Sequence, residues 1–235
     1  MRAEPVTHAP EEPPPSAYRY ERKFLVAALG RAEIETAIRL HPALFSAIFH
    51  ARHVNNIYLD TPGCEAYFEA VNGDTNRVKA RIRWYGAASG VIAKPVLEFK
   101  IKRGLVGRKA SYPLAPFPLD GAITGETLRS VFDRSDLPEP VREYLSARSP
   151  ALLNRYLRTY HRSADGRFRI TVDDALTYAS PGAPERIVPD RVHRIVELKY
   201  AEGDEPDAHR IASRFPFRLT KSSKYVMGLN ALGVW

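Results

Sequence analysis

The sequence predicts an α+β domain in which seven or eight strands form a barrel with helices around it. Six segments alternate charged or polar residues with apolar ones, which is the two-residue period of a strand with one apolar face. Helical spacing is confined to short segments between and after these strands. The 235 residues contain no internal repeat and no linker able to separate domains. Residues 17–235 are therefore expected to form a single domain.

The N-terminal elements follow from alternation and from breaker residues. Residues 17–27 alternate and then become apolar, as in a strand that enters a core. Residues 31–41 place apolar side chains at helical spacing, and Pro42 ends the helix. Residues 53–61 read as a strand, which Thr61-Pro62-Gly63 terminates.

The middle of the chain is expected to be mostly strands. Residues 77–85 alternate without interruption, and residues 94–104 and 105–114 form a hairpin that turns at Gly104. Residues 124–148 are then expected to form two helices. Thr124 or Gly125 would start the first helix, and Pro138 and Pro140 the second.

The C-terminal part begins with a predicted hairpin. Residues 152–163 and 167–178 alternate, and Ala164-Asp165-Gly166 between them is a hairpin turn signal. Residues 191–200 form a further strand. Two helices then complete the fold, one over residues 204–215 with Asp204 as its cap, and one over residues 221–232.

Composition places the chain among soluble globular proteins, with 44% hydrophobic and 26% charged residues. The single Cys64 excludes an intrachain disulfide and fits a reducing compartment. No apolar run approaches the roughly 18–20 residues that cross a bilayer, so a membrane role would need a membrane-protein partner. Residues 1–16 are proline-rich and lack the apolar segment of a secretion signal, so they are expected to be a disordered lead-in. A cytoplasmic location is the default expectation.

One strand carries an unusual row of like charges. In RVKARIRWY (77–85), every second residue is cationic and the residues between are apolar. The cationic face consists of Arg77, Lys79, Arg81 and Arg83, and the apolar face of Val78, Ala80, Ile82 and Trp84. Such a row of cations repels itself unless water or an anion lies against it. The net charge of +8 also favours an anionic partner, without separating nucleic acid from nucleotide, polyphosphate or an acidic membrane.

Five other strands repeat this pattern with a few carboxylates among the cations. Their charged faces carry Arg19, Glu21 and Lys23; Glu98, Lys100 and Lys102; Tyr156, Arg158, Tyr160 and Arg162; Arg167, Arg169, Thr171 and Asp173; and Glu197 and Lys199. Two arrangements remain open, an exposed sheet with cross-strand ion pairs or a barrel with a polar lumen. A basic lumen would be costly to bury unless a multiply charged anion occupied it. Interspersed carboxylates would suit a phosphate chain that carries a divalent metal.

Seven short motifs in fixed order resemble the VTC domain, over roughly residues 17–230. They are ERK (21–23), KARIRWY (79–85), LEFKIK (97–102), NRYLRTY (154–160), FRITVD (168–173), VELKY (196–200) and SKY (223–225). The VTC domain is the catalytic domain of vacuolar transporter chaperone complexes, within the CYTH or triphosphate tunnel metalloenzyme superfamily. The resemblance implies an antiparallel eight-stranded tunnel barrel with a polar, basic lumen and peripheral helices. It also implies binding of ATP or another triphosphate with Mn²⁺ or Mg²⁺, and synthesis of polyphosphate.

The resemblance assigns roles residue by residue. The phosphate-binding cations would be Lys23, Arg81, Arg83, Lys100, Arg158, Arg169 and Lys224. The metal would be held by Glu197, together with Glu98 or Glu21. Many superfamily members begin E-x-E-x-K, but Arg19 stands at the first acidic position here, which removes a carboxylate that a second metal would use. The segment YERKF matches the VTC branch better than the adenylyl cyclase or thiamine-triphosphatase branches.

Other interpretations remain at this stage. The same scaffold could hydrolyse a triphosphate or an RNA 5′-triphosphate, or bind polyphosphate or RNA without catalysis. Nucleic acid is disfavoured, because carboxylates among the cations repel phosphate unless a metal intervenes. For individual residues, Glu197 could instead pair with a lumen cation, Lys224 could be an exposed helix lysine, and Arg77 and Lys79 could lie at the tunnel mouth. Tyr156 and Tyr160 would either stack on a nucleobase or fill the barrel.

Overall fold

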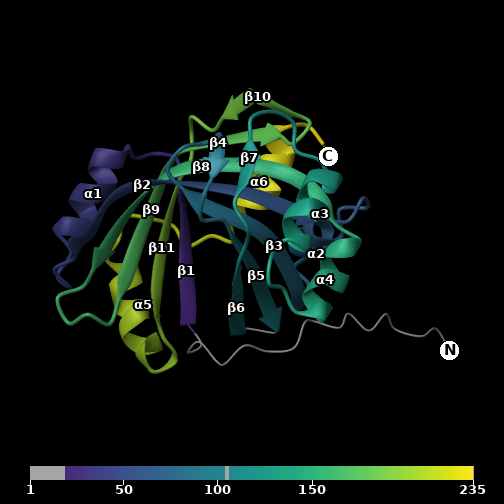
Figure 1. The fold of residues 1–235 in the computed structure, drawn as a ribbon. Coiled ribbons are helices and arrows are strands. Elements are labelled where there is room, and N and C mark those ends of the chain that lie inside the picture. Colours follow the sequence, from purple (N-terminus) through teal and green to yellow (C-terminus); the bar gives the residue numbers. More distant parts are fainter. Residues whose placement is uncertain (1–18, 104–105, 235) are drawn as a thin grey trace.

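A computed structural model describes residues 19–103 and 106–234 as one curved antiparallel sheet with helices around it (Figure 1). The predicted lead-in over residues 1–16 and the predicted turn at Gly104 lie outside these ranges. The strands of the main sheet are β1 (Arg19–Val26), β2 (Ser46–Asp60), β3 (Asn76–Tyr85), β5 (Val96–Arg103), β6 (Val106–Pro113), β8 (Ser149–Arg162), β9 (Arg169–Ser180), β10 (Ala183–Pro189) and β11 (Arg194–Ala201). The helices are α1 (Arg31–Arg39), α2 (Glu65–Asn72), α3 (Gly125–Asp133), α4 (Glu139–Ser146), α5 (Glu205–Ser213) and α6 (Lys224–Ala231). A separate two-stranded sheet joins β4 (Gly90–Ile92) to β7 (Phe117–Leu119).

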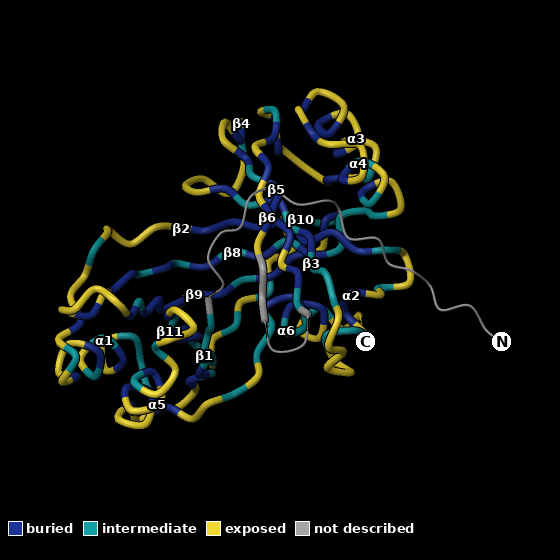
Figure 2. The backbone as a smooth tube through the Cα atoms, turned by 90° about the horizontal axis from the view of Figure 1, so that it is seen from below, coloured by how far each residue is buried: buried dark blue, intermediate teal, exposed yellow. Residues whose placement is uncertain are grey.

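Eight strands follow one path through the sheet, as expected for a tunnel barrel. Their order is β1-β11-β9-β8-β2-β3-β5-β6, and β10 adds to β9 outside this path. Within the described residues the ladder does not close, because β1 pairs only with β11 and β6 only with β5. The two ends of the path nevertheless come together, since Lys100 on β5 donates to Glu21 on β1 over 2.5 Å. Figure 2 shows these strands surrounding a central region.

The outer, convex face of the sheet is apolar, as the alternation predicts. Ile82, Trp84 and Phe99 belong to a core that includes buried side chains of α3 and α4. Val172 and Leu198 belong to a second core, which includes buried side chains of α1 and α5. Burying both sets releases the water that would otherwise hydrate them, and this hydrophobic gain fixes which face of each strand points outward. The cations are thereby directed to the concave face.

Helix α6 packs against apolar side chains at one end of the concave face. Its residues Tyr225 and Leu229 share a core with Leu152 and Tyr178 from β8 and β9. The approach is close at Gly228, where a Cβ atom would lie 2.4 Å from Leu152 and 2.6 Å from Tyr178. A larger residue therefore cannot occupy this position without displacement of the helix. The side chain of Ser223 accepts a hydrogen bond from the Val226 amide and caps the helix.

All eight predicted strands and five predicted helices are present within a few residues of their expected bounds. The prediction was incomplete for α2, β4, β7 and β10, and for β2, which begins at Ser46 rather than at residue 53. The first half of β2 is exposed on both faces, so it lacks the alternation that marks a half-buried strand. Among the described helices, none is long and apolar enough to cross a membrane.

Candidate active site

The concave face gathers cations from several strands around four carboxylates, three of which are buried. Register alone brings some of them together, because Arg81 on β3 lies opposite Glu98 on β5, and Lys79 lies opposite Lys100. Toward the other end of the strand order, Lys23 on β1 lies opposite Glu197 on β11. The four carboxylates are Glu21, Glu98, Asp173 and Glu197.

Glu98 holds three cations from neighbouring strands. Arg81 donates to one of its oxygens through Nε (3.0 Å) and Nη2 (2.8 Å). Arg83 Nη1 lies 3.4 Å from the same oxygen, and Lys109 on β6 approaches to 2.5 Å. Burial opposes ionisation of Glu98, but Arg81 and Lys109 keep its pKa below the ordinary value. One negative charge is therefore shared by three positive charges.

Asp173 anchors a second group at the α6 end of the site. It is fully buried and accepts from Arg158 Nε (2.5 Å) and Nη2 (2.6 Å) in a bidentate pair. Lys224 lies 2.6 Å from the second Asp173 oxygen. Lys224 is thus buried inside the sheet rather than exposed on its helix, and its neighbours Asp173 and Glu197 raise its pKa in spite of burial.

Glu197 and Glu21 connect this group to the rest of the site. Glu197 lies 3.0 Å from Lys199, 3.6 Å from Arg158 and Lys224, and 3.8 Å from Lys23. Glu21 in turn lies 3.0 Å from Lys23 and 2.5 Å from Lys100. Burial of Glu197 is offset by its lysine and arginine neighbours, which hold its pKa well below the ordinary value. Lys23 and Lys100 likewise hold the pKa of Glu21 below its ordinary value in spite of desolvation, so both carboxylates are ionised at neutral pH.

The site carries more positive charge than its own carboxylates neutralise. Eight cations pair with the four carboxylates: Lys23, Arg81, Arg83, Lys100, Lys109, Arg158, Lys199 and Lys224. The excess positive charge is one of the causes that lower the pKa values of two lysines. Desolvation and the neighbouring cations Lys23 and Arg77 lower the pKa of Lys79 to about 7. Desolvation together with Lys23 also lowers the pKa of Lys100, whose side chain is half-exposed, to about 8.

Lys79 lies inside the site rather than at a tunnel mouth. Its Nζ donates to Ser223 Oγ over 2.9 Å, which links β3 to the N-cap of α6. Two hydroxyls on β8 and β9, Tyr156 OH and Thr171 Oγ1, are buried without a hydrogen-bond partner among the described residues. Tyr156 is itself buried under cations, with Arg158 5.2 Å and Lys224 4.9 Å from its ring centroid. It therefore fills the barrel and is not available to stack on a base.

Nine of the ten predicted site residues meet in this network of ion pairs. The tenth, Arg169, lies on β9 in register with Lys199 and Arg162. Sequence reasoning did not assign site roles to Asp173, Lys79, Lys109 or Lys199. Three of these lay on faces already recognised as charged. Their importance depends on cross-strand neighbours, which alternation within one strand does not identify.

The carboxylates separate into two sets with respect to a metal. Glu21 and Glu197 both contact Lys23, whereas Glu98 contacts a different set of cations. No group of three or more His, Cys, Asp or Glu residues in the described ranges is arranged to hold a metal by itself. Mg²⁺ in nucleotide sites needs only one or two carboxylates, because phosphate oxygens and water complete its shell. The pair Glu21 and Glu197 fits that requirement, with oxygen donors that are ionised at neutral pH.

Comparison with solved structures identifies the same fold in distant proteins. A putative adenylate cyclase from Vibrio parahaemolyticus is 12% identical with a TM-score of 0.53, covering 91% of this chain and 99% of that chain. A protein from Pyrococcus horikoshii OT3 is 13% identical with a TM-score of 0.51, covering 90% of this chain and 99% of that chain. At these identities the likeness concerns the fold alone. No curated protein matches the chain in sequence.

A sequence profile gives the family directly. The profile described as "VTC domain" matches residues 18–233, which is nearly the whole chain. This range includes every strand of the curved sheet, all four carboxylates, and the cations that pair with them. The chain belongs to the VTC domain family.

Proposed function

We propose that this domain catalyses metal-dependent phosphoryl transfer on a triphosphate, and specifically the ATP-driven synthesis of inorganic polyphosphate. The observation that supports this most strongly is the uncompensated positive charge of the concave face. Eight cations share four carboxylates, and desolvation together with the neighbouring cations lowers the pKa values of Lys79 and Lys100. A triphosphate provides several negative charges and the oxygens to accept these donors.

The cations have distinct roles in this proposal. Arg81, Arg83 and Lys100 lie along β3 and β5 and would hold phosphates along the strand direction. Arg158 and Lys224 are fixed by Asp173, so they would present their remaining N–H groups in one orientation. Charges that are already in position require little reorganisation as the reaction proceeds, which is how electrostatic preorganisation accelerates a reaction.

Glu197 and Glu21 would hold a divalent metal together with phosphate oxygens. When bound, Mn²⁺ or Mg²⁺ supplies positive charge to the phosphate oxygens. The lysines that now contact these carboxylates, Lys23, Lys199 and Lys100, would then be free to contact phosphate oxygens instead.

The proposed reaction needs no general base from the protein. A terminal phosphate oxygen of the growing chain, already ionised, attacks the γ-phosphorus of ATP. The bond from the γ-phosphorus to the β–γ bridging oxygen breaks in line with the attack, and ADP leaves. The chain grows by one phosphate, and the protein contributes positioning and charge neutralisation. Arg81 and Arg83 would neutralise charge on the transferred group.

Incubation of the protein with ATP and Mn²⁺, followed by electrophoresis of the products, tests this function. Polyphosphate chains are expected. Free phosphate without chains would show a hydrolase on the same fold, and binding without turnover would show a binding module; either result contradicts the proposal.

Arg81→Ala should slow turnover by roughly thirty- to a thousandfold, because one preorganised charge-stabilising donor contributes about 2–4 kcal/mol to the transition state. Arg129→Ala, on the exposed side of α3, is the control.

A further inference from the structure

A cluster of three aromatic rings around one arginine lies beside the candidate active site. It consists of Phe49 and Arg52 on β2, Tyr85 on β3 and Tyr160 on β8, and we call it the aromatic platform. The guanidinium carbon of Arg52 lies 5.0 Å from the ring centroids of Phe49 and Tyr85, and 4.8 Å from that of Tyr160. Phe49 and Tyr160 also meet edge to face, with centroids 5.6 Å apart. A single cation is thus surrounded by three π-faces.

Irregular register in β2 builds this cluster. In a regular strand, Phe49 and Arg52 would point to opposite faces, because they are three residues apart. Against β8, however, Phe49 pairs with Tyr160 and Arg52 pairs with Arg158. An advance of three residues along β2 therefore corresponds to an advance of two residues along β8. A second register shift lies between Ala47 and Phe49. These bulges bring Phe49 and Arg52 to the same face, and bulges are frequent next to active sites because they redirect side chains.

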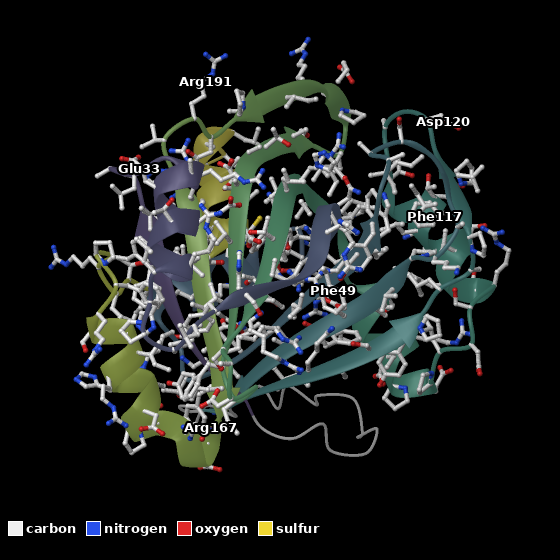
Figure 3. The ribbon with its side chains drawn as sticks, turned by 90° about the vertical axis from the view of Figure 1, so that its left-hand side faces the viewer. Glu33, Phe49, Phe117, Asp120, Arg167 and Arg191 are labelled. Carbon is white, nitrogen blue, oxygen red and sulfur yellow. The ribbon has the colours of Figure 1, made fainter. Side chains whose placement is uncertain are left out.

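The platform presents aromatic surface to solvent. Phe49 is 53% exposed and Tyr85 51% exposed, whereas Tyr160 is buried beneath them. Figure 2 shows the surrounding first part of β2 as exposed. Figure 3 places Phe49 centrally, between Glu33 and Arg167 on one side and Phe117 on the other. Covering exposed aromatic surface of this kind with another planar apolar surface is favourable, because both surfaces are removed from water.

The platform adjoins the phosphate-binding cations on the side away from α6. Tyr85 lies two residues beyond Arg83 on the same face of β3, and Tyr160 lies two residues beyond Arg158 on β8. Two residues correspond to about 6.5–7 Å along a strand. On β8, Leu152 packs with α6, Arg158 follows, and Tyr160 lies farther still. A linear ligand with its phosphates among the cations would therefore carry its other end over the platform.

We propose that the aromatic platform binds the nucleobase of a nucleoside triphosphate whose phosphates occupy the concave face. This inference rests on the proposed function, because it assumes that the cations bind a triphosphate. Phe49 and Tyr85 provide π-faces for stacking, and Arg52 is held among the rings, where its guanidinium group can also stack on a base. The platform would thus favour a nucleoside triphosphate over an inorganic triphosphate of similar charge.

Calorimetric titration with two ligands tests this inference. The ligands are the β,γ-imido analogue of ATP and inorganic tripolyphosphate, each with Mg²⁺ and the full chain. Phe49→Ala should weaken binding of the ATP analogue by roughly five- to a hundredfold, the range for loss of an aromatic–base stack, with tripolyphosphate unchanged within twofold. Phe49→Trp should restore analogue binding. Phe68→Ala on α2, which removes another exposed ring (40% exposed), is the matched control.

The outcomes separate this inference from the proposed function. If Phe49→Ala binds both ligands as well as the unaltered chain does, the platform does not bind the base. If it weakens both ligands equally, the residue supports the phosphate site, and the inference is also wrong. If the unaltered chain binds tripolyphosphate but shows no preference for the analogue, only the nucleobase inference fails. If it binds neither ligand, the proposed function and this inference both fail.

Discussion

Lys79 illustrates at the residue scale how ligand binding and stability oppose each other in this site. The lysine is packed among Lys23, Arg77 and Lys100, and burial with these neighbours lowers its pKa from 10.5 to about 7. Between pH 7 and pH 10.5, the unfolded chain therefore binds a proton at Lys79 that the folded chain does not. The free energy of unfolding consequently rises with pH in this window, and the charged lysine destabilises the fold most at and below pH 7. A bound anion would remove this cost.

Replacing Lys79 by methionine should therefore stabilise the protein and weaken ligand binding. Urea denaturation should show a higher free energy of unfolding for Lys79→Met at pH 6.5, with a smaller gain at pH 9.5. Tripolyphosphate affinity at pH 6.5 should fall by roughly ten- to a hundredfold, since a charged hydrogen bond contributes about 1.5–3 kcal/mol. Lys94→Met, on an exposed lysine outside the site, is the control. Reduced stability of Lys79→Met at pH 6.5 would contradict this description of the charge cluster.

At the scale of elements, the close contact between α6 and the sheet determines where Lys224 lies. Lys224 is the first residue of α6, and its contacts with Asp173 and Glu197 depend on how deeply the helix packs. Gly228, one turn further along the helix, permits this close packing because it has no side chain. Leu152 and Tyr178 occupy the space that a side chain at position 228 would need. Both neighbours are fully buried, so neither has room to move aside.

Gly228→Ala should therefore both destabilise the fold and weaken the site. Overpacking of this kind costs about 1–3 kcal/mol, partly offset by the higher helix propensity of alanine. We expect a lower thermal midpoint and weaker tripolyphosphate binding, because Lys224 is displaced with the helix. Gly203→Ala provides the matched control, since no atom lies within 4 Å of a Cβ at that position. Equal or greater stability of Gly228→Ala would show that α6 is not tightly packed.

The elements also show which features the sequence could predict. Alternation predicted the faces of β3, β5 and β9, because a strand that buries one face must place every second residue there. The short β4 and β7 and the exposed start of β2 lack that constraint, so no periodic signal marked them. Asp173 was recognised as part of a charged face, but its bidentate pair with Arg158 depends on the register between β8 and β9. The bulges that bring Phe49 and Arg52 to one face likewise depend on pairing with β8.

At the scale of the whole molecule, folding separates apolar from charged surface across one curved sheet. Two apolar cores cover the convex face, and α6 packs against the concave face at one end. Cations that would be dispersed on a flat sheet are thereby concentrated around four carboxylates. The resemblance in sequence predicted the eight-stranded path and the basic interior. It did not predict that, among the described residues, the backbone ladder would remain open between β1 and β6, with side chains of Glu21 and Lys100 joining the two edges.

The central claim is that the concave face, rather than net charge, binds a triphosphate. Calorimetric titration with tripolyphosphate compares two double variants of equal net charge, Arg81→Ala/Arg83→Ala on β3 and Arg129→Ala/Arg134→Ala on α3 and its C-cap. The β3 variant should lose on the order of a hundredfold or more in affinity, because two charged hydrogen bonds are removed, and the α3 variant should bind like the unaltered chain. Equal loss in both variants, or none in the β3 variant, would contradict the claim.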